Sequence, residues 1–211
     1  MTTAVEFQHT MDRFIELYGD RTGEIGDAIR GGLAWIEDTK VVLLGGNREA
    51  VYHLSDWRRF SRLVGLAQQL RRPVLLWNLS FRTETIAQQD SSLVVHHAFQ
   101  NSQLQLLKLS YPIIGVFDNY QYRVSLESEL ATFDGAVLVE SDNSLLSNER
   151  SFSSRIKIAS CQEDAKVKIA HLLNQVSVIP AGVLVSDRID RIQRITFSSR
   201  LKSKPSKDID L

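Results

Sequence analysis

The sequence holds a single cysteine, Cys161, among its 211 residues. One cysteine excludes an internal disulfide and any zinc site built from several cysteines of this chain. A chain without disulfides suits a reducing compartment, so we expect the protein in the cytoplasm. Cys161 follows an Ile-Lys-Ile-Ala run and has no identifiable histidine partner, which favours a structural thiol over a nucleophile.

The sequence also lacks a charge excess and a long apolar run. Lys plus Arg and Asp plus Glu both number 25, so nothing draws the chain toward nucleic acid, and we expect no nucleic-acid partner. No stretch reaches the roughly 18 apolar residues of a membrane span, and the N-terminal MTTAVEFQHTMDRF is not a secretory signal. We therefore expect neither export nor a membrane span.

The composition is that of a folded protein, with 43% hydrophobic and 24% charged residues. The length suits one domain, which we expect over residues 1–197. Residues 198–211 (SSRLKSKPSKDIDL) are polar and cannot bury much surface. We predict that they form a flexible tail.

The first elements are predicted from capping and periodicity. Thr3 and Glu6 have capping-box spacing, and apolar residues then recur at helical intervals up to Gly19, which predicts a helix. The apolar runs 33–36 and 41–44 predict a hairpin whose second strand ends at Gly45 and Gly46. Ser55 is the predicted cap of a helix that Pro73 closes.

The rest of the chain alternates between strand and helix patterns. We predict strands at 74–79, 113–117 and 136–140, helices at 90–109, 125–132 and 162–175, and a further apolar run at 182–185. Strands that are apolar on both faces and alternate with helices indicate a largely parallel sheet covered on both sides. The predicted fold class is therefore α/β.

Three segments carry a family resemblance. FIELYGDR (14–21) followed by DAIRGGLAWIEDTKVVLLGG (27–46) resembles the opening of the α subunit of the multi-subunit acetyl-CoA carboxylase carboxyltransferase. Strands introduced by Pro73 and Pro112 occur in the family's order of elements. VSDRIDRI (185–192) resembles the family's short motif after its last core strand.

The resemblance implies a crotonase or ClpP-like fold of stacked β-β-α units and an active site shared between an α-type and a β-type subunit. The implied partner is a second copy of the chain or a carboxyltransferase β-like subunit. In that family a carboxyl group passes from carboxybiotin to an acyl-CoA, and paired backbone N–H groups stabilise the developing oxyanion. An acyl-CoA or a carboxybiotin carrier is thus implied, although the residues alone demonstrate no cofactor.

The sequence lacks the family's glycines at two loops. Residues 80–85 (SFRTET) stand where the family has an Asp-Thr-Pro-Gly turn and a glycine-containing loop, and residues 118–129 (DNYQYRVSLESE) replace a glycine-rich run. Side chains there fill space that the family leaves open for substrate. We expect a divergent, non-catalytic or assembly subunit. The alternative is an active acyl-thioester carboxyltransferase or decarboxylase with a remodelled site, in which other amides take over.

The candidate site residues lie at these strand ends and loops. Amides after the hairpin are candidates for an anion or thioester oxygen, although a plain turn explains them as well. The candidate substrate-binding residues are Gly45, Gly46, Asn47, Ser80, Thr83 and Asn119. Tyr120 and Tyr122 are the candidate catalytic residues, because a phenol can donate a proton to an enolate.

Other polar residues have ordinary interpretations. His96 and His97 are adjacent on a predicted helix, so they cannot chelate one metal together, and we expect one to pack and one to be exposed. Five arginines interleave with the apolar stripe of the helix after Ser55. They indicate a solvated face, or a contact with a CoA phosphate or an acidic partner: Arg58, Arg59, Arg62, Arg71 and Arg72.

Overall fold

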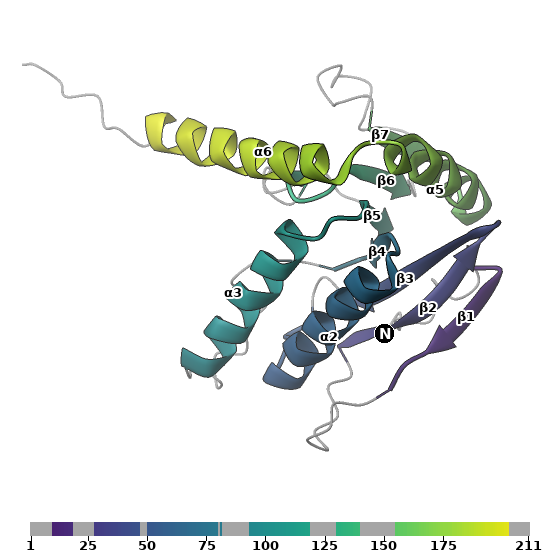
Figure 1. Cartoon of the computed structure of the whole chain (residues 1–211), viewed down its shortest axis with the longest axis horizontal. Coiled ribbons are helices and arrows are strands. Elements are labelled where there is room, and N and C mark those ends of the chain that lie inside the picture. Colours follow the sequence, from purple (N-terminus) through teal and green to yellow (C-terminus); the bar gives the residue numbers. More distant parts are fainter. Residues whose placement is uncertain are drawn as a thin grey trace, which may run out of the picture.

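The structure, a computed structural model, describes residues 10–18, 28–46, 50–79, 81, 93–118, 130–139 and 155–202, with side chains to residue 194. Strands and helices alternate along most of this part of the chain (Figure 1). The strands are β1 (Arg13–Glu16), β2 (Ile29–Ile36), β3 (Thr39–Gly46), β4 (Val74–Trp77), β5 (Ile113–Asp118), β6 (Gly135–Val139) and β7 (Ile156–Ala159). The helices are α2 (Leu54–Leu70), α3 (Leu93–Leu107), α5 (Gln162–Ser177) and α6 (Ala181–Lys202).

The strands form one sheet whose spatial order follows the sequence from β1 to β7. β1, β2 and β3 pair antiparallel, and every pair from β3 to β7 is parallel. The β2–β3 hairpin turns through Glu37 and Asp38, and the Glu37 N–H donates to Asp12 Oδ2 at 2.6 Å. The predicted hairpin and the largely parallel sheet are both confirmed.

Helices cover both faces of the sheet. β3 is buried on both faces, which explains why its sequence does not alternate between apolar and polar residues. Val42 and Leu44 belong to the apolar cluster that contains α2 and α3 side chains, whereas Val41 and Leu43 belong to the cluster that contains α5 side chains. Figure 1 shows α2 and α3 on one side of the sheet and α5 on the other. A strand buried on both faces needs apolar residues at every position.

The observed N-cap of helix α2 lies two residues before the predicted cap, Ser55. The N-cap is His53, and its backbone N–H donates to Asp56 Oδ2 at 2.9 Å, so a carboxylate closes the first turn. At its other end Arg71 takes a left-handed φ of 56° ahead of Pro73, as predicted for the helix stop. Its buried apolar residues are Trp57, Phe60, Leu63, Val64 and Ala67.

The predicted N-terminal helix is wrong where the structure describes it. Residues 13–16 form β1, and Arg13 and Glu16 pair with Trp35 and Gly32 of β2. The spacing of Phe14, Ile15 and neighbouring apolar residues fits a helix as well as a strand, and only pairing with a distant strand decides between them. Residues 1–9, in which the predicted capping box falls, lie outside the described part of the chain.

The apolar run 182–185, to which the sequence assigned neither helix nor strand, is helical. It forms the first turn of α6, in which Leu184 and Arg188 point inward four residues apart. A strand that we did not predict, β7, comes from the Ile-Lys-Ile-Ala run before Cys161. β7 is only four residues long and pairs with β6 on one edge, so its sequence pattern is weak.

The remaining boundaries differ by a few residues. Helix α3 covers 93–107 of the predicted 90–109, β6 begins and ends one residue early, and most of the predicted helix 125–132 lies outside the described residues. α6 continues to Lys202, five residues into the predicted tail. Among the described residues no single helix is long and apolar enough to cross a membrane, and the α5–α6 pair passes that test only when taken together across its 109° bend.

Candidate functional site

The carboxyl ends of β3, β4 and β5 meet at one edge of the sheet, which is where α/β folds usually bind ligands. Two of the predicted site residues, Gly45 and Gly46, lie there, buried at the end of β3. The other predicted site residues lie outside the described part of the chain: Asn47, Ser80, Thr83, Asn119, Tyr120 and Tyr122. Within the described part of the chain, the candidate site consists of the ends of β3, β4 and β5.

Gly46 makes room for a packed side chain. A Cβ at this position would lie 2.4 Å from Leu79 Cδ2 and 3.0 Å from the Tyr52 hydroxyl oxygen. Leu79 and Tyr52 are themselves buried. On this side of Gly46, the described structure is filled by Leu79 and Tyr52, so packing explains the glycine without a ligand.

Asn78 and Asp118 connect the ends of β4 and β5. The Asp118 backbone N–H donates to Asn78 Oδ1 at 2.8 Å, and Asn78 Nδ2 donates to Asp118 Oδ2 at 3.2 Å. Trp77 Nε1 donates to the same carboxylate oxygen at 2.6 Å. Asn78 adopts a left-handed φ of 49°, a conformation that asparagine tolerates well, and its own N–H donates to Val116 O at 2.8 Å. The backbone N–H groups of Asn78 and Asp118 are thus both engaged within the protein.

The N-terminus of α2 is likewise occupied by a protein carboxylate. Asp56 is fully buried, and its two oxygens accept the N–H groups of His53 and Ile29 at 2.9 and 3.1 Å. Arg59 donates to Ile29 O at 2.7 Å. β1 ends at Glu16, before it can pair with Ile29, so α2 satisfies the backbone groups of Ile29 in its place. A carboxylate at a helix N-terminus repels a second anion, which disfavours ligand binding at this end.

The five arginines of α2 and its C-terminal turn divide into two groups. Arg59 is buried, and its guanidinium donates a hydrogen bond to the Ile29 carbonyl oxygen. The prediction of a solvated face is therefore wrong for this residue. The other four are exposed as predicted: Arg58, Arg62, Arg71 and Arg72. His96 and His97 are both exposed on α3, which corrects the expectation that one of them packs, since the inward positions of that helix are taken by Val95 and Phe99.

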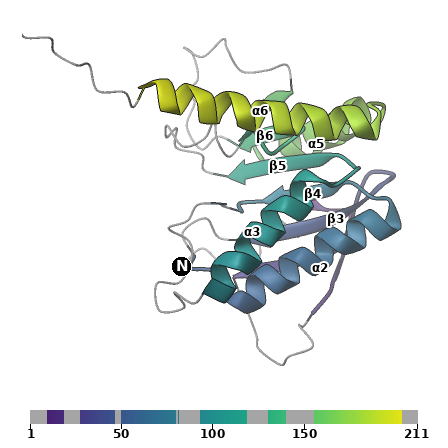
Figure 2. The same ribbon diagram turned by 60° about the vertical axis from the view of Figure 1, so that its left-hand side comes forward.

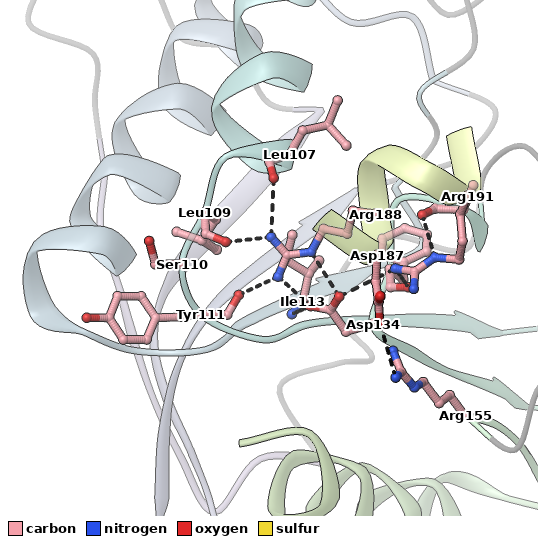
Figure 3. A network of polar contacts seen from close by, with 12 residues as sticks. Leu107, Leu109, Ser110, Tyr111, Ile113, Asp134, Arg155, Asp187, Arg188 and Arg191 are labelled. Carbon is pink, nitrogen blue, oxygen red and sulfur yellow. Dashed lines mark hydrogen bonds and ion pairs between the residues drawn. The ribbon is translucent and has the colours of Figure 1, made fainter. Parts of the chain in front are cut away.

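A buried ionic network that sequence reasoning missed joins α6 to the strands (Figure 3). Arg188 and Asp134 are both 0% exposed, and Arg188 Nε donates to Asp134 Oδ1 at 2.9 Å while Nη2 donates to Oδ2. The same guanidinium donates to the backbone carbonyl oxygens of Leu109 and Tyr111, the latter at 2.8 Å. Asp134 Oδ2 also accepts the Ile113 N–H at 2.9 Å.

Arg191 lies one turn further along α6 and extends this network. It donates to Phe133 O at 2.9 Å and Ala131 O at 3.1 Å, and it lies 3.5 Å from Asp134 Oδ1. Burial lowers the pKa of Arg191, and the Asp134 carboxylate opposes that shift. These contacts are all internal, so the network anchors a helix. The repeated Asp-Arg pairs in the segment 187–191 were its only sequence signal.

A metal site and a reactive cysteine are the two other kinds of site to consider. Among them, no group of three or more His, Cys, Asp or Glu side chains is placed to hold a metal ion. Cys161 is exposed at the N-cap of α5 rather than buried, so the structural role predicted for its thiol remains a prediction.

Comparison with solved structures identifies proteins with the same architecture. A transcarboxylase 12S hexamer, solved with hydrolysed methylmalonyl-coenzyme A, superposes with a TM-score of 0.58 at 13% identity, over 81% of this chain and 40% of that one. The Pseudomonas malonate decarboxylase hetero-dimer superposes with a TM-score of 0.54 at 11% identity, over 95% of each chain. This chain has the crotonase-type carboxyltransferase fold.

The β subunit of P. aeruginosa geranyl-CoA carboxylase has the same fold, with a TM-score of 0.52 at 13% identity over 85% of this chain and 43% of that one. No family model matches the sequence, and no curated protein matches it. At such low identities the likeness establishes the fold alone. The predicted α/β crotonase class is confirmed, and this chain spans less than half of the transcarboxylase and geranyl-CoA carboxylase chains.

Proposed function

We propose that the chain is a non-catalytic, carboxyltransferase-like assembly subunit related to the acetyl-CoA carboxylase carboxyltransferase α type. The observation that carries the proposal is the engagement of donors at the strand ends. The N–H groups of Asn78 and Asp118 and the N-terminus of α2 are used by protein acceptors. An oxyanion hole instead needs donors that are preorganised and left for the developing charge.

The sequence of the two loops supports the same proposal. Residues 80–85 and 118–129 contain no glycine, and backbone that must approach a thioester closely generally requires one. The resemblance to the family is therefore strongest in the scaffold and weakest where its chemistry would be. The solved neighbours with this scaffold include a hexamer and a hetero-dimer, which supports an assembly role for this chain.

The second candidate function is an acyl-thioester carboxyltransferase or decarboxylase with a remodelled site. The Asp118 carboxylate favours it, because this acidic group lies at the end of β5 beside Asn78 and Trp77, directly before Tyr120 and Tyr122 in the sequence. In this case the Asp118 carboxylate would orient a bound acyl group or accept a proton from it.

Titration calorimetry with acetyl-CoA and malonyl-CoA, beside an assay for carbon dioxide release from malonyl-CoA, distinguishes the two. The assembly role predicts no turnover and no binding tighter than the millimolar range, about −4 kcal/mol. Binding together with turnover would refute it in favour of the enzyme. That activity should then fall in Asp118→Asn and persist in Asp190→Asn, a matched change at an exposed position on α6.

A further inference from the structure

Helix α3 presents an exposed face that contains apolar residues and no charge. Leu93, Val94 and Leu104 are 89%, 56% and 50% exposed. From residue 91 to residue 107 the sequence contains no Asp, Glu, Lys or Arg, although such residues make up 24% of the chain. In Figure 2, α3 lies in front of the strands, and no other labelled element crosses in front of it. Depletion of charge from an exposed helix face is typical of a protein–protein interface.

The opposite face of α3 is fixed to the domain, so the exposed residues cannot turn inward. Its buried residues are Val95, Phe99, Ser102 and Leu106. Ser102 Oγ lies 2.8 Å from Ser61 Oγ of α2 and contacts the Trp57 carbonyl oxygen at 3.2 Å. The Phe99 ring packs edge-on against Trp57 with centroids 4.8 Å apart. The orientation of the helix is therefore set by α2.

The spacing of the exposed stripe is symmetric about a point between Ala98 and Phe99. Leu93, His97, Gln100 and Leu104 follow at intervals of four, three and four residues, which places all four on one side of the helix. Leu93 and Leu104 are equally far from the point between Ala98 and Phe99, and so are His97 and Gln100. A two-fold axis at that point would set each Leu93 beside the partner's Leu104.

We propose that this stripe, the α3 stripe, binds a second copy of the chain in an antiparallel arrangement. The inference deepens the proposed assembly function by naming the partner and the surface. An uncharged face offers no electrostatic complementarity to a charged partner. A second copy of the same uncharged face carries no charge that would be buried unpaired. The helix dipoles oppose each other in an antiparallel pair, which favours antiparallel over parallel pairing.

The size of the stripe sets the expected strength. A helix of 15 residues is about 22 Å long and, with its side chains, about 10 Å wide. This footprint is smaller than the roughly 800 Å² per partner of a standard stable interface. The association should therefore be reversible, with a dissociation constant in the range of about 1 to 100 μM.

Sedimentation velocity of the full chain across that concentration range tests the stripe. The wild type should shift from monomer toward dimer as its concentration rises, and Leu104→Glu should remain monomeric. Val167→Glu is the matched control, because Val167 is 61% exposed on α5, on the other side of the sheet, and this variant should dimerise like the wild type. A wild type that remains monomeric at about 100 μM, or a dimer that Leu104→Glu leaves intact, overturns the proposal.

Disulfide trapping tests the antiparallel register. The only native cysteine is the exposed Cys161, so Cys161→Ser gives a background without thiols. In it, Gln100→Cys lies near the proposed two-fold axis and should form a disulfide-linked dimer under mild oxidation, whereas Val167→Cys should not. Equal cross-linking of both variants contradicts the register. Neither sedimentation nor disulfide trapping depends on acyl-CoA binding. Calorimetry can therefore refute the non-catalytic assignment while the dimer is confirmed, and these two experiments can refute the dimer while the non-catalytic assignment holds.

Discussion

Replacing Arg188 with methionine should be among the most destabilising single changes in the chain. Methionine keeps much of the side chain's length but removes every donor of the guanidinium. The change leaves the buried Asp134 carboxylate without its closest counter-ion, and it strips the Leu109 and Tyr111 carbonyl oxygens of a donor. Breaking a buried ion pair from one side costs about 3–5 kcal/mol, a large part of the stability of an ordinary domain.

The partner change should be milder. In Asp134→Asn the amide oxygen can still accept the Ile113 N–H, and Arg188 keeps its carbonyl acceptors. Hence the loss should be about 1.5–3 kcal/mol, the range for hydrogen bonds to a charged group. The double variant should cost less than the sum of the two single variants, because the second change removes a charge that the first has already left unpaired.

Urea unfolding followed by tryptophan fluorescence measures these differences. A loss of 3–5 kcal/mol corresponds to a melting temperature lower by about 6–20 °C for a domain of this size. Arg191→Met is the matched control on the same helix, and it should cost clearly less than Arg188→Met because its side chain is 29% exposed. If Arg188→Met does not fold, Arg188→Lys retains the charge and should still fall between wild type and the methionine variant. A loss below about 1 kcal/mol in Arg188→Met would refute the reasoning.

Three further substitutions probe the scaffold. Gly65→Ala should stabilise α2 by about 1 kcal/mol, because a Cβ there meets nothing within 4 Å. Gly32→Ala should destabilise the fold, because its Cβ would lie 2.0 Å from Ile15 O. Thermal melts of both variants check this contrast. The hydrogen bond from Arg30 holds the pKa of Glu16 below its usual 4.5. Ionised Glu16 therefore stabilises the fold above that pH. This contribution to stability is lost as the pH falls through the pKa of the folded state. Glu16→Gln should therefore cost about 1 kcal/mol at pH 7 and progressively less below about pH 4.5, and urea titrations at several pH values that find a constant deficit contradict this.

The central strands were predictable because their signal is local. β3, β4 and β5 are buried on both faces, so their sequences are short apolar runs bounded by turn residues. β1 was not predictable in the same way. Phe14 and Ile15 are only partly covered, and their strand conformation depends on hydrogen bonding to β2 about 20 residues away.

The contacts at the candidate site were less predictable than its location. Sequence reasoning placed Gly45 and Gly46 correctly at the end of a strand, but the groups that pack on Gly46 come from Leu79 and Tyr52 on other elements. The Arg188–Asp134 pair spans 54 residues and has no periodicity that a local pattern would reveal. Burial of a charge is decided by tertiary packing, which the composition of a helix does not report.

The hydrogen bonds at the ends of β4 and β5 connect stability to the proposed role. A catalytic site leaves polar groups unpaired until its ligand arrives, and such groups lower the stability of the free protein. At the ends of β4 and β5, by contrast, the Asp118 backbone N–H and Oδ2 are paired with the side-chain amide of Asn78. The arrangement ties parallel strands together at the edge of the sheet where a ligand would bind. Stabilising the scaffold at that edge serves association through an outer helix such as α3 better than it serves chemistry at the strand ends, which supports an assembly role.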